Sequence, residues 1–184
     1  MTSQDLAVKG QPPRVETDQL NRTYRHMEWA DATIWRAALS DRTYAEDDFV
    51  RASLHHIHFV QRAYLGVWTG EAIDGDDEDR FDDAEAVARW GREAHPRIRG
   101  FVEGLDRSRL DRPMSLPWAG HLLRDAGREP DVTSMEETLH QLAAHSSHHR
   151  AQVNRRLRVL GAEPPPIDYI YWAWIGRPEP EWPV

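Results

Sequence analysis

The sequence of 184 residues contains no cysteine. This absence excludes disulfides, thiolate nucleophiles and cysteine-ligated metal sites, so any bound metal must be held by His, Asp or Glu. The chain also lacks a secretory signal and any apolar run long enough to span a bilayer, so we expect no membrane partner. The net charge of −8 argues against nucleic acid, because binding to phosphates needs a basic surface. We therefore expect a globular, cytoplasmic protein.

Apolar residues recur with helical spacing in four segments of the chain. The segments are approximately residues 18–40, 48–69, 83–105 and 134–160. Gly70 and Gly161 mark the ends of the second and fourth segments, and Ser134 begins a capping-box pattern with Glu137. Pro96 is expected to kink or stagger the third segment. The pattern predicts an all-α protein built as a four-helix bundle.

Two stretches do not follow this periodicity. Residues 106–133 are rich in Pro and Gly and predict a long irregular loop before the fourth helix, with room for a small hairpin. The tail, residues 168–184, is aromatic, so we expect it to pack on the bundle or on another subunit. Together with Trp29, expected to be exposed, the tail suggests a homodimer. We interpret residues 18–184 as one domain and residues 1–17 as a flexible lead-in.

The fourth helix carries two histidines on one face. His145 and His149 are four residues apart, so both can reach one metal ion. At about 100° per residue, His149 falls inside the apolar stripe, His145 lies on its flank, and His148 points to solvent. A single inward histidine is usually a hydrogen-bonded core residue, but two such histidines each need a partner. Ser146 replaces the Glu of zinc metallopeptidases, so we expect no peptidase of that type.

The second helix is expected to supply a third ligand. His56 and His58 lie at opposite edges of its apolar arc, whereas His55 points outward. His56 and His58 diverge by about 200°, so at most one of them can join the fourth-helix pair on a single ion. Periodicity leaves the choice between them open.

Asp31 lies in the middle of the apolar face of the first helix. A buried carboxylate needs a partner, and the simplest partner is an indole or an arginine. Alternatively, Asp31 accepts a hydrogen bond from a ligand imidazole or acts as a general base beside the metal, which makes it a candidate catalytic residue.

Three motifs combine these residues: Met27–Asp31 in the first helix, Leu54–Ile57 in the second and His145–Gln152 in the fourth. They resemble Asn-x-Trp-Ala-Asn, Leu-x-His-Ile and His-x-x-x-His-Arg-Gly-Gln, the motifs of the DinB/YfiT-like family of metal-dependent proteins. The likeness covers nearly the whole chain from about residue 18. The sequence departs from the family pattern at Met27, where Asn is usual, and at Ala151, where Gly is usual.

The resemblance implies an up-down-down-up four-helix bundle with a Zn²⁺ or Ni²⁺ site. By motif position its ligands are His56, His145 and His149, so the resemblance favours His56 over His58. Relatives of this kind include thiol S-transferases that use bacillithiol or mycothiol, and a mycothiol-dependent isomerase.

Three neutral imidazoles leave one open position on a tetrahedral ion, which is typical of catalytic sites. We therefore expect a metal-dependent transferase or hydrolase that activates a low-molecular-weight thiol or water against a small-molecule electrophile. One alternative is a non-catalytic, stress-associated protein in which the metal braces the bundle. Another is a metal-free bundle that binds a partner through its aromatic surface.

Overall fold

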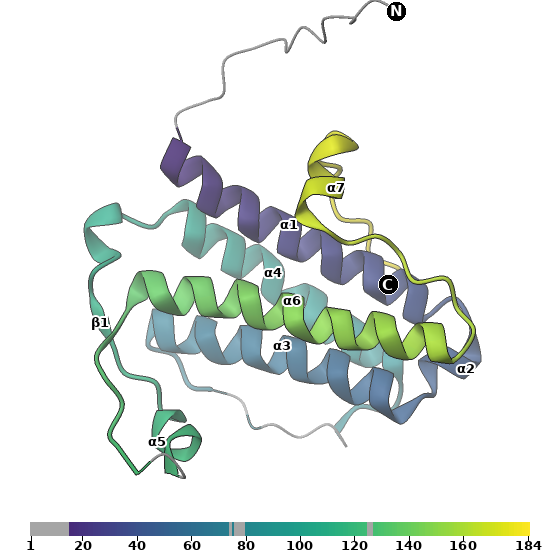
Figure 1. Ribbon diagram of the computed structural model, residues 1–184, viewed down its shortest axis with the longest axis horizontal. Coiled ribbons are helices and arrows are strands. Elements are labelled where there is room, and N and C mark those ends of the chain that lie inside the picture. The colour runs from purple at the N-terminus through teal and green to yellow at the C-terminus, as the bar shows by residue number, and fades with distance from the viewer. Residues whose placement is uncertain (1–14, 74, 76–79, 125–126) are drawn as a thin grey trace, which may run out of the picture.

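A computed structural model describes residues 15–73, 75, 80–124 and 127–184, and these residues are mostly helical (Figure 1). The four long helices are α1 (Val15–Ala38), α3 (Asp48–Thr69), α4 (Ala84–Glu103) and α6 (Met135–Val159). Helix α3 packs against α4 and α6, and α1 packs against the same two helices. The predicted all-α class is confirmed, and α6 contacts both α1 and α3 along its length (Figure 1).

Shorter elements connect the long helices. They are α2 (Arg42–Ala45), the 3-10 helix η2 (Arg107–Arg109), β1 (Pro113–Met114), α5 (Ala119–Leu122), β2 (Thr133–Ser134) and α7 (Tyr169–Trp174). Strand β1 pairs antiparallel with β2, with Pro113 opposite Ser134. The small hairpin expected in the long loop before α6 is therefore a pair of strands with two residues each, which joins the two ends of that loop. Within the described ranges, no helix combines the length and the apolar character needed to cross a membrane.

Local capping chemistry fixes where the long helices begin and end. Ser134 Oγ accepts from the Glu137 N–H while the Glu137 side chain accepts from the Ser134 N–H, which confirms the predicted capping box at the start of α6. Asp47 caps α3 in a similar way by accepting from the Val50 N–H. Helix α3 ends at Gly70, whose φ of 76° lies in the left-handed region that glycine adopts without strain.

Two expectations about the helices can be compared with the structure. Helix α1 begins at Val15, so it includes the last residues of the predicted lead-in, whereas residues 1–14 lie outside the described part of the chain. Helix α4 continues through Pro96. The proline removes one backbone hydrogen bond, but His95 and Ile98 on either side are both buried, and this packing compensates for the loss.

The core contains two large apolar clusters, with buried polar residues between them. One cluster includes Trp68 and Leu139, and the other includes Trp35 and Leu157. Each long helix contributes buried polar residues near the junction of the two clusters. They are Asp31 on α1, His58 and Gln61 on α3, His95 on α4, and Ser146 and Arg150 on α6. The fold therefore brings these six buried polar residues together at one level of the helical bundle.

The aromatic tail packs on the bundle, where its helix α7 contacts α1. Packing on the bundle was one of the two arrangements expected from the sequence. Trp172 is buried and forms a small cluster with Trp29 and Ala30. Trp29 was expected to be exposed, and this expectation is wrong, because the tail covers it. Trp174 remains 77% exposed on the outer side of α7.

Candidate metal centre

Three imidazoles converge between α3 and α6. His56, His145 and His149 each offer a ring nitrogen, and these three atoms lie within 4.8 Å of one another. The Nε2 atoms of His145 and His149 are 3.1 Å apart, and the ring of His56 lies 4.8 Å from that of His149, centroid to centroid. The structure thus brings together the three residues selected from the sequence. It places His56 beside the α6 pair and His58 elsewhere, among the buried polar residues.

The donor atoms fit a small divalent ion. Two nitrogens bound to tetrahedral zinc at about 2.0–2.1 Å stand about 3.3 Å apart, close to the separation of the two Nε2 atoms. His149 Nδ1–H donates to Gln152 Oε1 over 2.9 Å, which leaves the His149 Nε2 lone pair directed at the other imidazoles. Gln152 also donates through Nε2 to His148. Its side chain therefore fixes both the tautomer and the orientation of a candidate ligand.

The local environment favours the neutral form of His145 and His149. Burial, together with the neighbouring rings of His149 and His56, lowers the pKa of His145 to about 4. The pKa of His149 is also lowered, first by burial and then by His56. Neutral imidazole is the form that binds a metal, so His145 and His149 have the charge state of metal ligands near pH 7.

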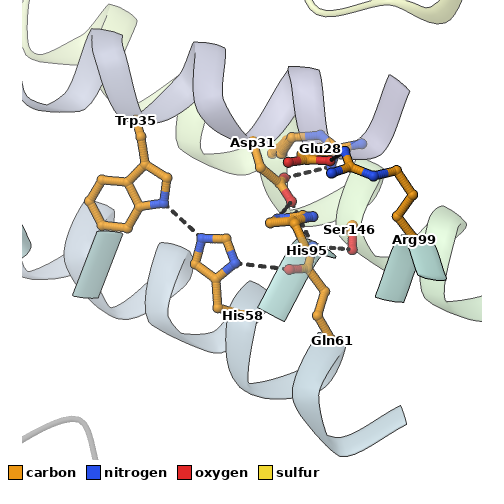
Figure 2. Close-up of polar contacts among 9 residues, drawn as sticks. Glu28, Asp31, Trp35, His58, Gln61, His95, Arg99 and Ser146 are labelled. Atoms are coloured by element: carbon orange, nitrogen blue, oxygen red, sulfur yellow. Dashed lines mark hydrogen bonds and ion pairs between the residues drawn. The ribbon is translucent and has the colours of Figure 1, made fainter. Parts of the chain in front are cut away.

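Asp31 is the centre of a separate, fully buried polar network (Figure 2). Arg150 Nη1 donates to Asp31 Oδ1 over 2.7 Å, and Gln61 Nε2 donates to Asp31 Oδ2 over 2.6 Å. His95 Nε2 lies 3.2 Å from the same Oδ2 atom. Gln61 Nε2 also contacts Ser146 Oγ at 3.3 Å. The network thereby joins α1, α3, α4 and α6.

His58 belongs to this network and has both ring nitrogens in use. Trp35 Nε1–H donates to His58 Nε2 over 2.7 Å, and His58 Nδ1–H donates to Gln61 Oε1 over 2.9 Å (Figure 2). The donor atoms of Asp31, His58 and His95 also lie within 4.8 Å of one another. However, the His58 lone pair is occupied, and the Arg150 guanidinium beside Asp31 repels a cation. We therefore interpret this cluster as a hydrogen-bonded network.

Asp31 forms an ion pair with Arg150. An arginine was one of the two simplest partners expected from the sequence. Burial alone would raise the pKa of Asp31, but Arg150 and His95 hold that pKa well below its usual value. A carboxylate in this state is a weak base. The assignment of Asp31 to catalysis stays a prediction, and the geometry favours an effect exerted through Arg150, which directly follows His149 in α6.

Two further histidines were assigned to solvent from helical angles. His148 is exposed, as expected. His55 is only 2% exposed, so that prediction is wrong. Its ring stacks on Trp90 of α4 at 5.2 Å and lies near Phe81, which precedes α4. The helical angle located the correct face of α3, but it could not show that aromatic residues distant in sequence cover that face.

Sequence reasoning missed three residues that shape the site. Gln152 follows His149 by three residues and so lies on the same helical face, a spacing that could have identified it. Gln61 stands in the same relation to His58. His95 gave a weaker signal, because only its place among the buried residues of α4 distinguishes it from an ordinary core histidine.

Fold and site together define a class, the helical proteins in which imidazoles from two helices form a candidate metal centre. The family model described as the DinB family matches residues 16–181. The chain therefore belongs to the DinB family. No curated protein matches the chain.

Proposed function

We propose that this DinB-family protein is a metal-dependent enzyme of the transferase or hydrolase type, with His56, His145 and His149 holding a divalent ion, Zn²⁺ or Ni²⁺. The observation that carries the proposal is the convergence of three imidazole nitrogens within 4.8 Å. Three such ligands are the donor set of catalytic zinc, in which the fourth position stays open. A bound ion would supply Lewis acidity, which lowers the pKa of a thiol or water in that position.

The residues of the chain would hold and orient the ion. His145 and His149 present adjacent nitrogens from one rigid helix, and Gln152 keeps the Nε2 lone pair of His149 free. His56 reaches the pair from α3, so the three ligands link two helices that already pack closely. In the transferase reaction, the thiolate sulfur would form a bond to the electrophilic carbon, the leaving group would depart with the bonding pair, and the thiol proton would pass to solvent.

Asp31 is proposed as a positioning residue for this site. Its ion pair with Arg150, together with the contact between Gln61 and Ser146, restrains α6 at the residues that directly follow His149 and His145. A change in this network would rotate or shift the ligand pair without touching it.

Metal analysis tests the site directly. Protein purified without an affinity tag is expected to bind one equivalent of Zn²⁺ or Ni²⁺, measured by inductively coupled plasma mass spectrometry after dialysis. The variant His145→Ala/His149→Ala is expected to lose the metal, while His140→Ala, at an exposed histidine on the same helix, is the matched control. Metal content unchanged by the double substitution would overturn the assignment.

Catalysis needs its own measurement. The metal-loaded protein is incubated with 1-chloro-2,4-dinitrobenzene and, in separate reactions, bacillithiol, mycothiol or no thiol. Thiol-dependent release of chloride that is lost in His149→Ala, with the circular dichroism spectrum retained, supports the transferase. Hydrolysis without thiol supports the water-activating form.

The alternative function is a non-catalytic metal brace between α3 and α6. Because the three ligands come from two packed helices, a bound ion would also stabilise the fold. This alternative predicts a large rise in melting temperature on metal binding, no turnover, and unfolding of His149→Ala under mild conditions.

Two structural parts of the proposal extend beyond the site. We propose the up-down-down-up order of helices for the bundle, supported by the contacts of α1 with α6 and of α3 with α4.

We also propose a homodimer, supported by the exposed apolar side chains of Ile170, Trp174 and Ile175 on the tail. Sedimentation equilibrium of the wild type and of Trp174→Ala tests the dimer.

A further inference from the structure

A hollow lies on the opposite side of α6 from the three histidines. It has a volume of about 650 Å³ and lies between α1, α6 and the chain segment 164–169. On α6, its lining residues Ser147, Ala151, Asn154 and Arg158 follow one another at intervals of four, three and four positions, so they share one face of the helix. The candidate metal ligands begin two residues earlier, at His145, which places them about 200° around the helix. The hollow is therefore separate from the candidate metal centre.

Two unpaired arginines line this hollow. Arg155 and Arg158 are exposed and form no ion pair with any residue in the described ranges, whereas Arg156 between them pairs with Asp47. The chain has 31 acidic and 23 basic residues, so acidic partners are in excess. Arg158 lies in the last turn of α6, where the helix dipole favours a cation. The dipole does not explain Arg155, which lies one turn earlier.

A buried donor lies deeper in the same hollow. Arg150 is 2% exposed and lines the hollow, and its Nε–H has no hydrogen-bond partner among the described residues. An unsatisfied buried donor is unfavourable, more so when it belongs to a charged group, so a ligand that accepts this hydrogen bond would recover that free energy. The guanidinium of Arg150 donates to Asp31 through Nη1, and the edge that carries Nε makes no hydrogen bond to the described residues.

The remaining polar groups leave the hollow positively charged. Asp168 is the only carboxylate among the described residues that line it, against three guanidinium groups. His26 adds no positive charge near pH 7, because burial lowers its pKa, and its Nε2 lies 2.8 Å from the Ile167 carbonyl oxygen. Asn154 donates to the Pro165 carbonyl and so ties the segment 164–169 to α6 at the wall of the hollow.

We propose that this hollow, lined by Arg150, Arg155 and Arg158, binds an oxyanion, namely the carboxylate or phosphate group of a small molecule. Guanidinium groups suit this role, since their planar donors match the oxygens of carboxylates and phosphates. Arg150 supplies a buried donor, and the two exposed arginines supply charge at the solvent side. The proposal does not depend on the enzymatic activity or on the metal.

Calorimetric titration of the full chain tests the proposal. Inorganic phosphate and succinate are titrated separately at constant ionic strength into protein freed of metal with a chelator, because an anion could otherwise bind a metal ion. Saturable binding of at least one anion is expected, and the tighter of the two identifies the group that the site prefers. Arg155→Ala/Arg158→Ala is expected to weaken binding by at least about tenfold, since it removes two charge-assisted contacts at exposed positions.

The control variant Arg112→Ala/Arg128→Ala removes the same charge from exposed positions elsewhere. Unchanged affinity in this control supports the hollow as the site. Absence of saturable binding, equal weakening in both double variants, or binding only in the metal-loaded protein would each overturn the proposal. Since the titration uses metal-free protein, its result is independent of whether the three histidines hold an ion.

Discussion

At the scale of single residues, His58 is held in one protonation state by its neighbours. Trp35 donates to Nε2, and Gln61 accepts from Nδ1–H, so the neutral ring satisfies both contacts. Protonation would direct the new N–H of His58 at the N–H of Trp35. Burial adds to this effect and lowers the pKa of His58 to about 4.

Acid is therefore expected to destabilise the protein through His58. Between pH 6.5 and about 4 the unfolded chain binds a proton at this residue and the folded chain does not, so the free energy of unfolding falls as the pH falls. The full loss from His58 is about 3 kcal/mol. Urea denaturation of the wild type and of His58→Gln over this range measures it. The variant should show a flatter profile, and parallel profiles would contradict the prediction.

Gly91 allows His58 to occupy its place. A Cβ atom at residue 91 would lie 2.3 Å from His58 Cδ2, so the helices can approach only with glycine there. Gly91→Ala is expected to cost about 1–3 kcal/mol or more in thermal or urea unfolding, because the buried ring cannot move without losing Trp35. Gly100→Ala on the same helix is the control, since nothing lies within 4 Å of its Cβ and alanine favours the helix. Equal effects at the two positions would refute the steric explanation.

At the scale of secondary structure, α6 presents polar side chains to three different environments. One face carries His145, His149 and Gln152 toward α3. Ser146 and Arg150 enter the buried network. A third face borders the hollow beside α1. Polar residues on three sides of the helix explain why its apolar stripe is interrupted between Leu142 and Val153.

Gln152 is expected to tune metal affinity without being a ligand. Removing its hydrogen bond to His149 Nδ1 frees the ring to rotate and to change tautomer. Gln152→Ala should therefore weaken Zn²⁺ binding by about 10- to 100-fold in competition with a chromogenic chelator. Gln141→Ala, exposed on the same helix, should leave the affinity unchanged. Equal affinity in wild type and Gln152→Ala would show that the hydrogen bond has no such role.

At the scale of the whole molecule, ion pairs attach the C-terminal tail to the surface of the bundle. Glu179 and Glu181 pair with Arg25 and Arg36 of α1. Trp182 then lies over His58 and His95, with ring centroids at 6.1 and 5.3 Å. The tail therefore covers the buried polar network as well as packing on α1.

Trp172 is expected to be the main anchor of this tail. It is 1% exposed and donates through Nε1 to the Pro178 carbonyl, so Trp172→Ala should lower the free energy of unfolding by about 3–5 kcal/mol. Trp174→Ala, at a 77% exposed position two residues away, should change it by less than about 0.5 kcal/mol under monomeric conditions. Chemical denaturation of both variants measures the difference, and a similar small effect in both would show that the tail is not part of the folding unit.

The sequence predicted what depends on local spacing. Helical periodicity located the long helices, and the spacing of four residues selected His145 and His149 on α6. It could not choose between His56 and His58, because the choice depends on which neighbouring helix faces each edge of α3. For the same reason it placed Trp29 and His55 in solvent, although distant aromatic residues cover both. Contacts between helices were therefore the part that a single sequence left open.

Helix α6 also sets a thermodynamic condition on the two sites beside it. His149 and Arg150 are consecutive residues of one continuous helix, so a ligand in the hollow that displaces the backbone at Arg150 would also displace the imidazole next to it. Any such coupling is reciprocal: the factor by which a bound anion changes metal affinity equals the factor by which a bound metal changes anion affinity. Titrating each ligand in the presence and absence of the other would close this cycle and give the coupling free energy between the sites.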